Sequence, residues 1–267
     1  MHLKRWITGL IVLPFVIFII YRGGIIFFLL IAVGNILALW EYFRIVLKEQ
    51  KKIISAFPLT AMIAGLVMIW TVHTGKGELA IGVLAVNLMV AALIAITRFG
   101  VEPAALETLK KQILGVIYIP LFLSCLILIR NSDNGMYWIF LLLSIVFAGD
   151  TGAFYVGTFL GRRKLAPAVS PGKTIEGSIG GLATGVAVGS LAKAIFLPDL
   201  PWPTSTLLCL VTGIAAQIGD LFESALKRAS NVKDSGNLLP GHGGILDRID
   251  ALLFAGPVVY LFIVYIL

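Results

Sequence analysis

The sequence predicts an all-α integral membrane protein that crosses the bilayer about nine times. Hydrophobic residues make up 59% of its 267 positions and only 13% are charged, about half the usual share in soluble domains. Its apolar runs repeatedly reach the ~17–25 residues that a helix needs to cross the hydrocarbon core. We place these segments at residues 5–21, 24–43, 55–72, 79–97, 113–130, 136–160, 176–197, 204–226 and 249–267.

Basic residues predict the orientation of these segments. With the N-terminus in the cytoplasm, 17 Lys and Arg side chains fall on the cytoplasmic side, and only Arg22, Lys76 and Arg130 fall on the opposite side. Cytoplasmic loops are enriched in Lys and Arg. We therefore expect a multi-pass protein of the inner (cytoplasmic) membrane, with its C-terminus outside. The net charge of +7 has the same explanation and does not indicate nucleic-acid binding.

Polar residues divide the chain into two regions. An N-terminal transmembrane region, residues 1–130, contains five predicted helices with few polar side chains. Asn35 and Asn87 are expected to form interhelical hydrogen bonds there, and Glu41 to anchor a helix end at the interface. This region is expected to shape a lipid-accessible cavity or an oligomer contact, such as that of a homodimer. The C-terminal transmembrane region, residues 131–267, has four predicted helices and cytoplasmic loops.

The most polar stretch of the chain runs from Ser224 to Asp250, between two apolar segments. Charges this dense beside membrane helices cost free energy unless they are solvated, paired or bound to a ligand. The stretch is therefore the first candidate for a functional site. Its charged and titratable residues are Lys227, Arg228, Lys233, Asp234, His242, Asp247, Arg248 and Asp250.

Carboxylates from two helices are expected to converge at this stretch. Asp220, Ser224 and Lys227 share one helix face by their spacing. A solvated helix end would show the same spacing, but Asp220 still lies within an apolar run. Asp247 and Asp250 begin the last helix. Carboxylates without nearby cysteines favour Mg²⁺, which is commonly shared with substrate phosphates.

Asp150 is an acid within an otherwise apolar segment, among small residues. Acids at this depth are rare and commonly functional. The alternative is a protonated side chain that makes a helix-to-helix hydrogen bond.

A second polar motif, Ser170–Gly177, precedes the seventh segment. Thr174 can cap the helix that follows, and Lys173 beside the exposed helix amides can bind phosphate. Glu176 can bind a metal or orient Lys173. The alternative is an ordinary capped helix whose lysine only helps to set the topology.

These motifs resemble the signature of phosphatidate cytidylyltransferases, also called CDP-diacylglycerol synthases. The pattern Ser-x-x-Lys-Arg, Lys-Asp and Pro-x-His-Gly-Gly-x-x-Asp-Arg-x-Asp is present without departure from Ser224 to Asp250. The Asp-x-Gly-Ala motif at Asp150 and the motif at Ser170 are similar to family segments as well. The resemblance implies phospholipid biosynthesis in the bilayer, in which CTP and phosphatidate give CDP-diacylglycerol and pyrophosphate.

The resemblance also suggests roles for individual residues. His242 is expected to donate to a phosphate oxygen, although an ordinary loop hydrogen bond is an equal alternative. Mg²⁺ is the expected cofactor, and a second cation could accompany it. The expected catalytic residues are Asp220, Asp247, Lys227 and His242. The expected metal ligands are Asp220, Asp247, Asp250 and Asp150. The expected substrate-binding residues are Ser170, Lys173, Thr174, Glu176, Ser224, Arg228, Lys233, Asp234 and Arg248.

The sequence gives weaker support to three other functions. A transporter or ion channel would also place acids inside membrane helices, but the sequence shows no internal repeat or paired broken helices of the kind such proteins carry. A structural scaffold would not need the combined acidic and basic residues. A CTP-dependent polyprenol kinase is not expected to carry this signature.

Overall fold

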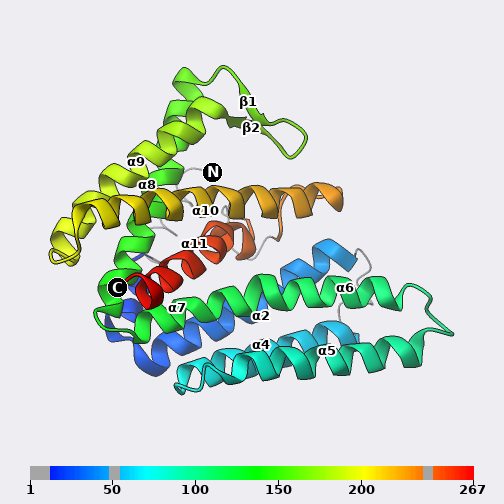
Figure 1. Ribbon diagram of the computed structural model, residues 1–267. Coiled ribbons are helices and arrows are strands. Elements are labelled where there is room, and N and C mark those ends of the chain that lie inside the picture. Colours follow the sequence, from blue (N-terminus) through cyan, green and yellow to red (C-terminus); the bar gives the residue numbers. More distant parts are fainter. Residues whose placement is uncertain (1–12, 48–54, 237–242) are drawn as a thin grey trace. The chain divides into compact units, whose positions relative to one another are not determined.

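The computed structural model describes residues 13–47, 55–236 and 243–267, and within these ranges the chain is predominantly helical (Figure 1). Eight spans are long and apolar enough to cross a membrane. A shorter apolar helix, Leu13–Arg22, is the described part of the first predicted segment. The prediction of a multi-pass α-helical membrane protein is therefore confirmed.

Seven of the eight spans are single helices that match the predicted segments closely. The eighth begins earlier than residue 113, because an amphipathic helix precedes the apolar run. The single helices are α2 (Gly24–Leu47), α4 (Ala56–His73), α5 (Leu79–Arg98), α8 (Gly135–Leu160), α9 (Ile175–Phe196), α10 (Trp202–Ala229) and α11 (Leu246–Tyr265). The composite span consists of α6 (Ala105–Val116), the π-helical turn η1 (Ile117–Leu121) and α7 (Phe122–Asn131).

The π-helical turn of the composite span contains Pro120. Proline lacks the N–H that an α-helix requires, and its ring clashes with the preceding turn. A wider turn accommodates it without ending the helix. Lys111 lies in α6, where its Nζ donates to the Val46 carbonyl at 2.8 Å.

The chain folds into two compact units. The first holds the chain up to Asn131 together with Ser230–Arg248, and the second holds Ser132–Ala229 together with Ile249–Leu267. The stretch from Ser224 to Asp250, here called the signature stretch, is therefore divided between the units.

In the first unit, α4 packs against α2 and α5, and α6 packs against α4 and α5 (Figure 1). As predicted, Asn87 joins two helices, since its Oδ1 accepts from Gln112 Nε2 at 2.5 Å. The prediction for Asn35 is wrong, because its buried side chain makes no hydrogen bond within the described residues.

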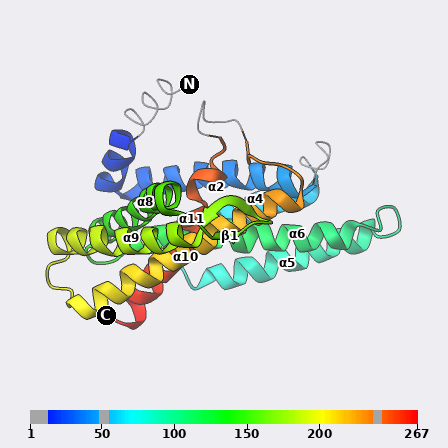
Figure 2. The same ribbon diagram turned by 90° about the horizontal axis from the view of Figure 1, so that it is seen from above.

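In the second unit, α8 and α9 run alongside each other in both views (Figures 1 and 2). Their contact depends on small residues. A Cβ built on Gly181 would lie 2.7 Å from the Gly149 carbonyl oxygen and 2.9 Å from Ala153 Cβ. Only glycine lets the two backbones approach this closely.

Gly181→Ala is expected to destabilise the protein by about 1–3 kcal/mol, because the methyl group would push two backbones apart. Gly34→Ala is the matched control, since nothing lies within 4 Å of a Cβ at this helical glycine. Alanine there should be neutral or stabilising by up to ~1 kcal/mol. Thermal unfolding in detergent measures both changes. Equal melting temperatures for the two variants would contradict the packing argument.

The chain also contains an element that was not predicted from the sequence, a two-stranded antiparallel hairpin between α8 and α9. Strand β1 (Lys164–Ala166) pairs with β2 (Ser170–Thr174), and Lys164 lies opposite Thr174. Proline and glycine near the start of β2 suggested only a chain break. An edge strand tolerates proline because the missing N–H is not needed there.

Candidate active site

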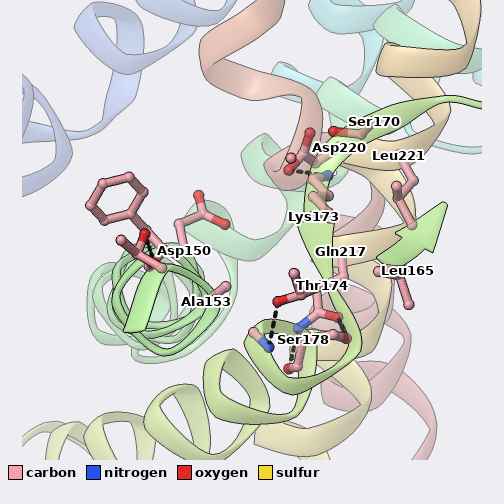
Figure 3. A pocket seen from close by; sticks show the side chains of 15 residues that line it. Asp150, Ala153, Leu165, Ser170, Lys173, Thr174, Ser178, Gln217, Asp220 and Leu221 are labelled. Atoms are coloured by element: carbon pink, nitrogen blue, oxygen red, sulfur yellow. Dashed lines mark hydrogen bonds and ion pairs between the residues drawn. The ribbon is translucent and has the colours of Figure 1, made fainter. Parts of the chain in front are cut away.

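A pocket of about 440 Å³ lies within the second unit, between α8, the hairpin, α9 and α10 (Figure 3). It brings together residues from three predicted motifs, namely Asp150, Lys173 and Asp220. Its other polar lining side chains are those of Thr158, Ser170, Thr174, Ser178 and Gln217.

An ion pair between Lys173 and Asp220 is the main charged contact in this pocket. The Lys173 Nζ lies 2.5 Å from Asp220 Oδ2, and the two side chains are 28% and 34% exposed (Figure 3). Strand β2 carries the lysine and α10 carries the aspartate. The pair keeps a cation and a carboxylate side by side and accessible, as a site that binds both phosphate and metal requires.

Local hydrogen bonds fix the strand that carries Lys173. Thr174 caps α9, as predicted, because its Oγ1 accepts from the Gly177 amide at 3.1 Å. Glu176 holds the base of the hairpin, since its Oε2 accepts from the amides of Arg162 and Arg163 at 3.0 and 3.1 Å. These hydrogen bonds hold the end of strand β2, from which Lys173 projects, in place.

Gln217 joins α10 to α9 at the same pocket. Its Nε2 donates to the Ser178 carbonyl at 2.9 Å, and the Ser178 hydroxyl donates to its Oε1. The prediction from sequence missed this residue. Gln217 lies three residues before Asp220 and therefore on the same helix face. This spacing could have identified it as a residue of the site.

Two further basic residues lie at the end of α10. Lys227 pairs with the buried Glu223 one helical turn earlier. Arg228 Nε donates to the Val169 carbonyl in the hairpin at 3.2 Å. The Arg228 contact joins the end of α10 to the hairpin, which also lines the pocket.

Within the first unit, the carboxylate of Asp247 holds two backbone amides of the signature stretch together. Its Oδ2 accepts from the amides of Gly244 at 2.9 Å and Ser235 at 3.2 Å. Other predicted residues of this stretch, Lys233, Asp234 and Arg248, are exposed. His242 lies outside the described residues.

Comparison with known proteins identifies the family. Residues 3–266 match the cytidylyltransferase family. The chain belongs to this family. Phosphatidate cytidylyltransferase of Bacillus subtilis (strain 168) is 34% identical over 269 residues, covering 96% of each chain. The Staphylococcus aureus (strain COL) enzyme of the same name is 32% identical over 267 residues, covering 97% of this chain and 98% of the relative.

A third relative shares a shorter region. The phosphatidate cytidylyltransferase of a Synechocystis species is 44% identical over 142 residues, which is 52% of this chain and 47% of the relative. The chain is thus a membrane-bound cytidylyltransferase, as its signature suggested. None of these relatives supports the transporter alternative.

The acids of the second unit can offer a metal some, but not all, of its ligands. Asp250 is 9% exposed, and its side chain interacts electrostatically with Asp220, Asp150 and Lys227 in the same unit. Within the described ranges, no three His, Cys, Asp or Glu side chains come close enough together to hold an ion. The described acids therefore do not form a complete metal site by themselves, and a cation bound there would need further ligands, such as the phosphates and water that Mg²⁺ commonly keeps.

The two predicted principal ligands belong to different units of the cytidylyltransferase. Asp220 belongs to the second unit and Asp247 to the first. A metal held jointly by these two residues stays a prediction.

Proposed function

We propose that this cytidylyltransferase transfers the cytidylyl group of CTP to phosphatidate, giving CDP-diacylglycerol and pyrophosphate. The observation that carries the proposal is the pocket that combines Lys173 and Asp220 in a chain of this family. The full-length relatives bear the name of this activity. Apolar lining residues, including Phe154 and Leu221, suit the acyl chains of a membrane lipid.

The reaction requires positioning and charge neutralisation more than covalent work by the protein. An oxygen of the lipid phosphate attacks the α-phosphorus of CTP, and the bond to the pyrophosphate oxygen breaks. The attacking phosphate is already ionised, so no general base is needed. Ser224 binds or orients substrate and does not act as a covalent nucleophile.

Lys173 is assigned to the phosphates of CTP. When the nucleotide binds, its ammonium can exchange the Asp220 carboxylate for a phosphate oxygen, which leaves the carboxylate available to a cation. Ser170 and Thr174, on the same strand, flank it in the pocket. Lys227, Arg228, Lys233 and Arg248 supply further positive charge for the triphosphate.

Asp220 and Asp247 are the proposed metal ligands, with Asp250 and Asp150 as further oxygen donors. A bound Mg²⁺ would neutralise charge on the triphosphate and favour departure of pyrophosphate.

The activity is tested with purified protein, labelled CTP and phosphatidate in detergent micelles. Lipid-linked label and pyrophosphate should appear in equal amounts. Hydrolysis of CTP without a labelled lipid, or transfer of phosphate to a polyprenol, would contradict the proposal.

We further propose that the signature stretch faces the cytoplasm, where CTP is available. Lys233→Cys, in a chain whose Cys125 and Cys209 are replaced by alanine, should resist an impermeant thiol reagent in sealed right-side-out vesicles. It should be labelled after the vesicles are opened. Lys76→Cys is the control and should be labelled before opening, because Lys76 is exposed and assigned to the other side. Labelling of Lys233→Cys from outside would overturn the orientation.

A further inference from the structure

Glu41 is a fully buried carboxylate in an apolar membrane helix. It lies in α2 and is 0% exposed. A buried carboxylate is costly unless several donors satisfy it. The sequence suggested that Glu41 only anchors a helix end at the interface, and that interpretation is wrong.

Three hydrogen bonds from the signature stretch satisfy this carboxylate. Oε2 accepts from the Ser235 hydroxyl at 2.9 Å and from the Leu246 amide at 2.9 Å, and Oε1 accepts from the Ile245 amide at 3.1 Å. The Leu246 amide belongs to a residue 205 positions away in sequence. One side chain therefore binds both described ends of the segment between Ser235 and Leu246.

Two glycines make room for this carboxylate. A Cβ on Gly236 would lie 2.5 Å from Glu41 Oε1, and a Cβ on Gly244 would overlap both Glu41 Oε2 and Ser235 Oγ. The neighbouring Gly243 has φ +79°, a conformation that disfavours other residues. Gly236 and Gly244 are thus needed because the backbone passes close to Glu41 at both residues.

The carboxylate also lies at the beginning of α11. The first amides of a helix lack partners within the helix, and a negative charge there is favoured by the helix dipole. Glu41 binds the amide of Leu246, the first residue of α11, and the amide of Ile245 immediately before it, while Asp247 binds the amide of Gly244. The carboxylates of Glu41 and Asp247 together fix the residue at which α11 begins. The contacts of Glu41 also hold the backbone next to Asp247 in place.

We propose that Glu41 is a positioning residue for nucleotidyl transfer, which holds Ser235, Ile245 and the start of α11 so that Asp247 is correctly placed. The role rests on the transfer reaction proposed above. Glu41 acts through these groups and is not assigned a contact with substrate. Misplacement of a reacting group by about 1 Å can cost ~10²-fold in rate.

Glu41→Gln tests this role because glutamine keeps the size of the side chain but has only one acceptor oxygen. Its amide nitrogen would face a backbone donor. We expect kcat to fall about 10- to 100-fold, with the KM for phosphatidate within about twofold of wild type. Hydrogen exchange at the amides of Ile245 and Leu246 should accelerate, since their acceptor is lost.

Asn35→Ala is the matched control. Asn35 is also a fully buried polar residue of α2, but its side chain lies beside Gly65 of α4 and makes no hydrogen bond to the described part of the signature stretch. This variant should change the melting temperature without changing kcat per folded protein or the exchange of Leu246. If Asn35→Ala and Glu41→Gln lose activity only in proportion to lost folded protein, Glu41 is merely structural and the proposal is wrong.

Ser235→Ala provides a second variant in case Glu41→Gln does not fold. It removes one of the three donors, and we expect a smaller fall in kcat, of up to about tenfold. Wild-type kcat together with wild-type exchange at Ile245 and Leu246 would overturn the proposal. If wild-type protein makes no CDP-diacylglycerol, the proposed function fails, while the exchange measurements still decide whether Glu41 holds the segment.

Discussion

Asparagine in place of Asp220 or Asp247 is expected to lower kcat by about 10²-fold or more, while the protein remains folded. Each substitution preserves size and one oxygen but removes the negative charge. Asp220 is a half-buried carboxylate in the pocket with Lys173, and Asp247 organises the end of the signature stretch. If both act through one ion, the double variant should be little worse than either single variant.

The deciding measurement is the dependence of activity on Mg²⁺ concentration in each folded single variant. Both should require more Mg²⁺ or fail to reach wild-type turnover at any concentration. Asp199→Asn is the control and should behave as wild type, since Asp199 is an exposed residue outside the helices. Near-normal turnover at unchanged Mg²⁺ in both variants would rule out a shared metal. Lost stability with an unaltered Mg²⁺ requirement would instead indicate a purely structural role.

Lys173→Ala is expected to raise the KM for CTP by about 10- to 100-fold, with a much smaller effect on the KM for phosphatidate. The ammonium lies in the pocket beside Asp220 and one residue before the N-cap of α9. Positive charge at this position favours a triphosphate over a lipid that carries one phosphate. Steady-state kinetics with each substrate varied in turn measure both constants.

Lys164→Ala is the matched control for this lysine. It removes the same charge from the same hairpin, where Lys164 is exposed and lies opposite Thr174. Its KM for CTP should stay within about twofold of wild type if the effect at Lys173 arises from direct contact. A change confined to the KM for phosphatidate in Lys173→Ala would show that the assignment to the nucleotide is wrong.

Glu41 illustrates what sequence reasoning undervalued. Glu41 is an acid within the predicted segment 24–43, and charge inside a membrane span is costly, so it indicated a functional or structural role as Asp150 did. Its place near the end of the run suggested the solvated interface instead. Only the folded chain shows that a segment about two hundred residues later supplies its donors.

The sequence alone determined the membrane class, the positions of the helical segments, the cap at Thr174 and the family. These depend on local properties, namely the length of apolar runs, the spacing of motif residues and the chemistry of individual side chains. The tertiary structure decided the partners: Lys173 with Asp220, Gln217 with Ser178, and Glu41 with Ser235, Ile245 and Leu246. It also decided the β1–β2 hairpin. Such pairings join residues far apart in the chain, so they depend on how the helices pack. The periodicity of a sequence shows which face of a helix is apolar, but it does not show which other helix that face will contact.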